Sequence, residues 1–251
     1  MLFRSPESLS PVSEFVDQWR PLTSSFALVK APLKTAVDRF ATWHSTTARF
    51  PGQTGLRQEI INTPFPSALR TLEPFNRGDW RHLFVPTDSD WTLVVNSNLP
   101  APDLSSLAYV FADDYGLTTL VVRDQPHTLD TRTDKGRYGI FEFALYSPSG
   151  TGPSRIERMV RLLRELSAWE FLEIGEPLPF EHVERYKARR KTDRLDEALI
   201  IEYLGHMGAW PFNEKFYDVA EKPILVTKLH PNNDRPPLLT LEDLRAGAED
   251  D

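Results

Sequence analysis

Histidines are the first residues to test for chemistry, because imidazole is the commonest protein metal ligand and general base. The six lie at positions 44, 82, 127, 182, 206 and 230, and none has the spacing of a paired metal motif such as HExxH. One cluster, Glu181, His182 and Glu184, has three potential ligands within one helical turn. Acids at a helix start explain the glutamates without a metal. We therefore expect no metal site, and we expect no cofactor.

Two further segments resemble pieces of catalytic sites. SPSGTGPS (147–154) follows a strongly apolar run, but it lacks the Gly-Lys-Ser/Thr ending of a phosphate-binding loop and the glycine spacing of a nucleophile elbow. We interpret it as a surface turn. Asp113 and Asp114 close a predicted helix, where paired carboxylates could form a general acid, although an exposed helix end also explains them. No catalytic constellation follows from either segment.

A site assembled from residues far apart in the sequence is the alternative. Glu176, His182 and Tyr186 follow the predicted central sheet and could form an enzyme active site or a small-molecule site. Two prolines stiffen the loop that contains Glu176, and Phe180 is predicted to close the junction with the next element. Glu176 has no structural role that the sequence indicates.

The segment WPFNEKFY carries more aromatic surface than a loop needs, in Trp210, Phe212, Phe216 and Tyr217. It either caps the hydrophobic core or is offered to a partner. With no catalytic constellation, our leading hypothesis is a non-enzymatic protein-binding module, in which Trp210, Phe212 and Tyr217 contact the partner. One version of this hypothesis is an immunity-type inhibitor that covers the active site of a basic toxin with acidic side chains.

The charge of the chain bears on its partners. The formal net charge is −7, and an acidic surface repels phosphate backbones, so nucleic acid is not an expected partner. One basic patch, from Arg185 to Arg194, could bind RNA. Our interpretation is a solvated helix face whose cations pair with neighbouring acids.

The compartment is predicted from what the sequence lacks. It contains no cysteine, which excludes disulfides and thiolate zinc sites and fits a reducing compartment. It has no signal-peptide pattern at its N-terminus and no apolar stretch near the length of a membrane span. We expect a soluble cytoplasmic protein without a membrane partner.

The elements that must position these residues predict a single α+β domain, with a mostly antiparallel central sheet and helices packed on it. The domain is expected at 23–232, with an N-terminal arm at 1–22 and a C-terminal tail at 233–251. Strands are predicted at 25–30, 56–61, 80–85, 91–96, 118–124 and 138–146, with a late edge strand at 223–229. Helices are predicted at 32–44, 103–115 and 180–191, and Asp193 is expected to cap a further helix.

The central strand at 138–146 alternates two sets of side chains. Phe141, Phe143 and Leu145 are predicted on one face, and Glu142 lies on the other among apolar residues. A carboxylate in that position must face solvent, a partner or a basic side chain.

Local rules disagree over 155–166. Ser154 and Glu157 form a helix capping box, and the apolar residues that follow have helical spacing. However, WEFLEIGEPLPFEHVERYKARRKTDR, together with WTLVVNS and YGIFEFALYSP, resembles a group of uncharacterised bacterial proteins over roughly residues 80–217. In that group a strand, a glycine-rich turn and a Trp-x-Phe strand follow one another, although RELSA replaces the turn glycines here. The resemblance implies a strand at Arg158–Leu163, which we adopt, and it implies no activity, ligand or site residue.

Overall fold

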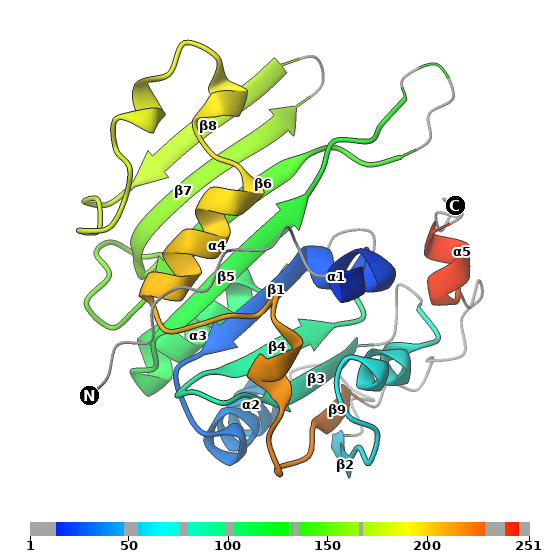
Figure 1. Cartoon of the computed structure of the whole chain (residues 1–251). Coiled ribbons are helices and arrows are strands. Elements are labelled where there is room, and N and C mark those ends of the chain that lie inside the picture. Colours follow the sequence, from blue (N-terminus) through cyan, green and yellow to red (C-terminus); the bar gives the residue numbers. More distant parts are fainter. Residues whose placement is uncertain are drawn as a thin grey trace.

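The computed structural model describes residues 14–47, 55–75, 80–98, 103–130, 132, 136–165, 168–228 and 239–245. Nine strands in these ranges form one antiparallel sheet, in the order β2-β9-β3-β4-β1-β5-β6-β7-β8 (Figure 1). Along the chain they are β1 (Ser25–Val29), β2 (Leu56–Ile60), β3 (Trp80–Pro86), β4 (Thr92–Asn96), β5 (Thr119–Gln125), β6 (Ile140–Tyr146), β7 (Ile156–Glu165), β8 (Ala168–Ile174) and β9 (Ile224–Lys228). The predicted fold class, α+β with an antiparallel central sheet, is confirmed.

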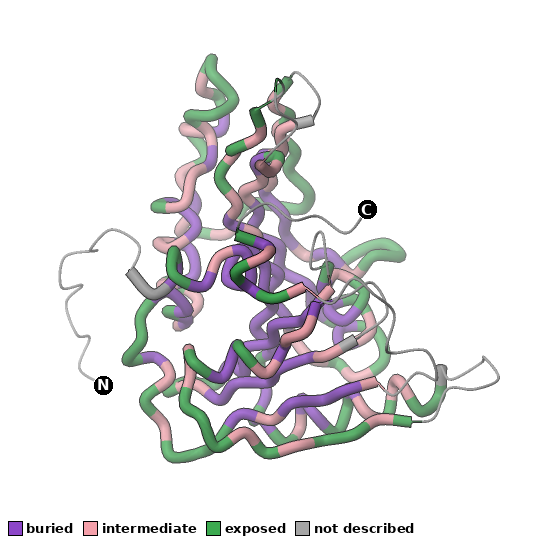
Figure 2. Tube along the Cα trace, turned by 90° about the vertical axis from the view of Figure 1, so that its right-hand side faces the viewer, coloured by how far each residue is buried: buried purple, intermediate pink, exposed green. Residues whose placement is uncertain are grey.

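Helices cover both faces of the sheet, and Figure 1 shows α4 in front of the strands with α2 and α3 behind them. The α-helices are α1 (Glu14–Trp19), α2 (Leu33–Thr47), α3 (Ser105–Tyr115), α4 (Glu197–His206) and α5 (Leu241–Arg245). Short 3-10 helices lie in the connections: η1 (Leu22–Ser24), η2 (Ser67–Leu72), η3 (Arg185–Lys187), η4 (Lys191–Asp193) and η5 (Glu214–Tyr217). Alternate strand residues therefore enter two hydrophobic cores, one beneath α4 and one beneath α2 and α3. Figure 2 shows the buried part of the trace concentrated between these layers.

Strand β6 has the predicted alternation. Phe143 and Leu145 lie in the core beneath α4, with Phe141 packed against it, whereas Ala144 lies in the opposite core. Glu142 is buried, 3.8 Å from the Arg123 guanidinium and 3.6 Å from that of Arg161. Burial raises the pKa of the Glu142 carboxyl, and the two arginines act against that rise. The expectation that this carboxylate meets a basic side chain is confirmed.

The segment at 155–166, for which the local rules disagreed, contains a strand. Residues Ile156–Glu165 form β7, which is hydrogen-bonded to β6 on one side and to β8 on the other. Apolar residues on both faces of an interior strand also produce helical spacing, so periodicity alone did not separate the two structures. The acid of the apparent capping box, Glu157, instead accepts hydrogen bonds from the Ser147 and Ser149 hydroxyls. The strand at Arg158–Leu163 is confirmed.

The helix predicted at 180–191 is wrong. That segment consists of turns and the short helices η3 and η4, because Arg158 on β7 binds the Glu181 carboxylate and lies over the Tyr186 ring, which holds both side chains in the interior. The predicted cap of the next helix is also wrong. The residue at the N-cap of α4 is Asp196, whose carboxylate accepts from the Leu199 amide at 2.9 Å, while Asp193 lies in η4.

Two predictions about the ends of the fold change. β9 is not an edge strand, because it lies between β2 and β3. Val16, Trp19 and Leu22, which fall within the predicted N-terminal arm, are buried in the core beneath α4, so the described part of that arm is packed. Residues 1–13 of the arm, and 233–238 and 246–251 of the predicted tail, lie outside the described residues.

Replacing Phe143 by alanine tests the core assignment. The buried ring meets Tyr203 edge to face with the centroids 5.8 Å apart, so its loss leaves a cavity beneath α4. We expect the free energy of unfolding in urea to fall by about 3–5 kcal/mol. Tyr138→Ala, an exposed aromatic just before the same strand, should cost less than about 0.5 kcal/mol. A loss below about 1 kcal/mol for Phe143→Ala would place this ring outside the core.

Candidate functional site

A buried ion pair organises the region that follows β8. The side chains of Arg158, on β7, and Glu181 are 1% and 0% exposed. Arg158 binds the carboxylate with both arms: Nε lies 2.9 Å from Oε1 and Nη2 lies 2.7 Å from Oε2. The carboxylate also accepts from the Leu178 amide and from the Tyr186 hydroxyl, each at 2.8 Å. Such an ion pair is stable in a low-dielectric interior only because these further donors satisfy its remaining lone pairs.

The same arginine fixes the turn that leaves β8. Arg158 Nη1 donates to the Gly175 carbonyl at 2.7 Å. Gly175 has a φ of +78°, and a Cβ at this position would stand 1.9 Å from the Glu157 carbonyl oxygen. Only glycine fits so close to the neighbouring strand. The loop between β8 and η3 is therefore attached to the sheet at Gly175 and at Glu181.

Two of the three residues of the predicted alternative site come together. The Tyr186 and Tyr203 hydroxyls lie 2.8 Å apart, and Tyr203 accepts from the His182 amide at 2.9 Å. The His182 ring bonds to Glu202 at 2.8 Å, and this bond raises the pKa of the imidazole. Burial, with the hydrogen bonds to Tyr203 and Glu181, raises the pKa of the Tyr186 hydroxyl. Tyr186 is thus a buried structural donor.

Glu176 is not brought to that pair. It is exposed, and it has no hydrogen bond or ion pair within the described part of the chain. The possible metal cluster also separates, because the Glu181 carboxylate is occupied by Arg158 and Tyr186. No group of three or more potential metal ligands is found among the described residues.

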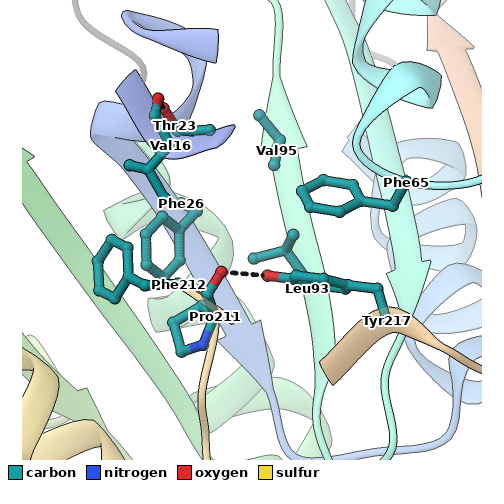
Figure 3. Close-up of a pocket in the computed structure, with 9 residues that line it drawn as sticks. All are labelled: Val16, Thr23, Phe26, Phe65, Leu93, Val95, Pro211, Phe212 and Tyr217. Carbon is teal, nitrogen blue, oxygen red and sulfur yellow. Dashed lines mark hydrogen bonds between the residues drawn. The ribbon is translucent and has the colours of Figure 1, made fainter. Parts of the chain in front are cut away.

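The aromatic connection mostly caps the core. Phe212 and Phe216 are buried. The half-buried Tyr217 packs against the tilted ring of Phe65, with the centroids 4.0 Å apart, and donates to the Pro211 carbonyl at 2.8 Å. Figure 3 shows Phe65, Phe212 and Tyr217 among the residues around a cavity of about 10 Å³, which has room for about one water molecule. Of the predicted contact residues, Phe212 and Tyr217 therefore complete the interior. Trp210 does not, because it is 48% exposed.

Three aromatic side chains lie near the C-terminal end of α4, and the ring of one of them, Trp210, meets Phe216 edge to face. The rings of Phe180 and His206 stack with their centroids 4.9 Å apart and their planes at 9°. Beside His206, Gly205 leaves room for the indole, whose Nε1 lies 3.5 Å from where a Cβ would stand. We call Phe180, His206 and Trp210 the α4 aromatic surface. The sequence indicated Phe180 and Trp210 separately, but not that His206 stacks on Phe180.

The sequence did not indicate a second ionic cluster. Arg20, after α1, lies 2.8 Å from Asp124 at the end of β5 and 3.0 Å from Glu197 at the start of α4. Asp124 is fully buried, and its Oδ1 has no hydrogen-bond partner among the described residues. Burial, together with the adjacent Asp124 carboxylate, raises the pKa of Glu197 to about 8. Arg20 lies 104 positions from Asp124 and 177 positions from Glu197 in the sequence. No local motif could therefore have revealed the cluster.

The basic patch divides into two groups. Arg185 pairs with Asp196 at 2.7 Å, and the Arg194 guanidinium lies over the Phe171 ring at 5.3 Å. The other four cations are exposed, and within the described residues they form no ion pair; they are Lys187, Arg189, Arg190 and Lys191. The predicted pairing with neighbouring acids therefore holds for Arg185 alone.

Comparisons of the chain with protein-family models, with curated proteins and with solved structures found no match. The resemblance to a group of uncharacterised bacterial proteins stays a prediction. In the part of the chain that the structure describes, no helix combines the length and the apolar character that crossing a membrane requires.

Replacing one member of the buried ion pair should lower the free energy of unfolding more than replacing both. Arg158→Met leaves the Glu181 carboxylate buried without a counter-ion, so we expect a loss of about 3–5 kcal/mol in the free energy of unfolding. The double variant Arg158→Met/Glu181→Leu should recover most of that loss. A urea double-mutant cycle measures both. If the double variant loses as much as the two single changes added together, the pair is not coupled in the way described.

Glu197 should make stability fall with rising pH. An unfolded glutamate loses its proton near pH 4.5, whereas folded Glu197 keeps it to about pH 8, so the folded state binds more protons between these values. The resulting stabilisation is fully present below about pH 4.5 and is lost as the pH rises towards 8. Glu197→Gln, which stays neutral, should flatten this part of the stability profile. Identical slopes in thermal unfolding from acidic to mildly alkaline pH would contradict the assignment.

Proposed function

We propose that this protein is a non-enzymatic module that binds a partner protein through the α4 aromatic surface. The observation that carries the proposal is the half-exposed indole of Trp210, in a connection whose Phe212 and Phe216 are buried. The core is closed by the buried rings, and the exposed face of the indole makes no contribution to it. Tryptophan is among the residues that contribute most to binding energy at protein interfaces.

The surroundings of this surface favour a basic partner. Glu202 lies on α4 one turn before His206, and Glu214 follows Trp210 by four residues; neither side chain is fully buried. Glu184, near His182, is exposed as well. Such acidic side chains, on a chain of net charge −7, would attract a positively charged surface and accelerate association with it. An inhibitor that covers the site of a basic toxin is one protein of this kind.

The alternative was an enzyme or small-molecule binder near Glu176, His182 and Tyr186. Binding is favoured over it because the Tyr186 hydroxyl already donates to Glu181. Glu176, in addition, has no hydrogen bond to either of the other two within the described residues. We also propose a cytoplasmic location, which the absence of cysteine supports.

Trp210→Ala tests the proposal. The immobilised full chain is incubated with extract of its native cell, and captured proteins are quantified by mass spectrometry. We expect the partner to bind at least about tenfold more weakly to the variant, equivalent to about 1.4 kcal/mol, with an unchanged thermal midpoint. Ile60→Ala, a change at a still more exposed apolar side chain on edge strand β2, is the control and should capture the partner normally. Equal capture by wild type and Trp210→Ala would remove this surface as the interface.

A further inference from the structure

Strand β8 presents an open edge. It is the last strand on its side of the sheet, and within the described residues it pairs only with β7. On β7, the Arg164 amide donates to the Gly139 carbonyl, on the side of β6. In an interior antiparallel strand, the backbone groups of successive residues form hydrogen bonds alternately to one neighbouring strand and to the other. On β7, Arg164 and every second residue before it therefore bond to β6, and the residues between them bond to β8. In the register of β8, the outward-directed amides and carbonyls are those of Trp169, Phe171 and Glu173.

These outward backbone groups have no hydrogen-bond partner in the described part of the chain. Beside them, on the face opposite α4, Leu172 is 40% exposed and Ile174 is 38% exposed. Among the described residues, α2 packs on β3 and α3 packs on β5 and β6, so the helices of this face lie over strands other than β8. An unpaired edge beside exposed apolar side chains is a template for an additional strand.

Cations lie on the other face of the same edge. The segment with η3 and η4 packs in front of β8, as Figure 1 shows, and η4 contacts the strand directly. Arg194 holds the segment there by stacking on Phe171. The exposed cations of this segment are the four named above, and we call them the loop cations: Lys187, Arg189, Arg190 and Lys191.

We infer that the β8 edge binds an extended, acidic segment of a partner protein as a tenth, antiparallel strand. Main-chain hydrogen bonds to Trp169, Phe171 and Glu173 supply affinity, as in other cases of strand addition. Side chains of the added strand alternate between the two faces of the sheet. Its acidic residues then face the loop cations, and the apolar residues between them cover Leu172 and Ile174.

A second copy of the chain fits this edge less well. A two-fold axis between two β8 strands would place both sets of loop cations side by side on the same face of the joined sheet, where they repel. Nucleic acid could use the loop cations, but it would leave the backbone groups and Leu172 without a role. This edge is separate from the α4 aromatic surface, so the two proposals stand or fall independently.

The experiment uses an acetylated, fluorescein-labelled octapeptide that alternates glutamate and valine, with binding to the full chain followed by fluorescence anisotropy. In antiparallel pairing, directly opposed residues share a face, so the glutamates opposite Trp169 and Phe171 are the residues that donate to β8. N-methylation of the glutamate amides should therefore abolish binding. N-methylation of the valine amides should leave it within about twofold, because those amides point away from the protein.

Variants of the chain complete the test. Arg189→Glu/Arg190→Glu should weaken peptide binding at least tenfold, because both cations face the added strand. Lys34→Glu/Arg57→Glu, an equal charge change at exposed sites on α2 and β2, should not, and Trp210→Ala should bind the peptide normally. The inference is overturned if the peptide does not bind, or if both methylated peptides bind equally. It is also overturned if a single-stranded RNA oligonucleotide binds more tightly than the peptide and loses affinity in Arg189→Glu/Arg190→Glu.

Discussion

The ion pair between Arg158 and Glu181 is the interaction on which the path of the chain after β8 depends. A charged pair buried to this degree survives only when its geometry is close and its other lone pairs and protons are satisfied. The Leu178 amide, the Tyr186 hydroxyl and the Gly175 carbonyl supply those partners. Each partner lies on the segment after β8, so satisfying the pair fixes the path of that segment. The path then sets where Phe180 meets α4 and where the loop cations lie against β8.

Ion pairs also join separate elements elsewhere in the fold. Arg20 joins the end of β5 to the start of α4 through Asp124 and Glu197, and Glu142 on β6 lies between two arginines. Replacing such ionic groups with apolar ones often does not reduce stability, so their contribution here is better understood as specificity. They select one arrangement of apolar elements that could otherwise slide past one another. That arrangement in turn sets the positions of the α4 aromatic surface and of the β8 edge.

The sequence predicted what local periodicity controls. The alternation in β6, the order of strands and helix from β3 to β5, and the class of the fold follow from apolar spacing and turn residues. The helix expected at 180–191 failed because the Glu181 carboxylate binds Arg158, 23 residues away, and holds the Tyr186 hydroxyl beside that pair in the interior. The Glu197–Asp124 contact and the stack of Phe180 on His206 are likewise tertiary. Glu176 and Tyr186 looked alike as site candidates because burial cannot be inferred from such a segment.

The central proposal is that the α4 aromatic surface contacts another protein. The most direct measurement is hydroxyl-radical footprinting of the chain alone and in complex with the partner captured from its native cell. Our account predicts that oxidation of Trp210 and His206 falls when the partner is bound, while Ile60 on the far edge stays equally reactive. Unchanged oxidation of Trp210 in the complex, with protection elsewhere, would contradict it.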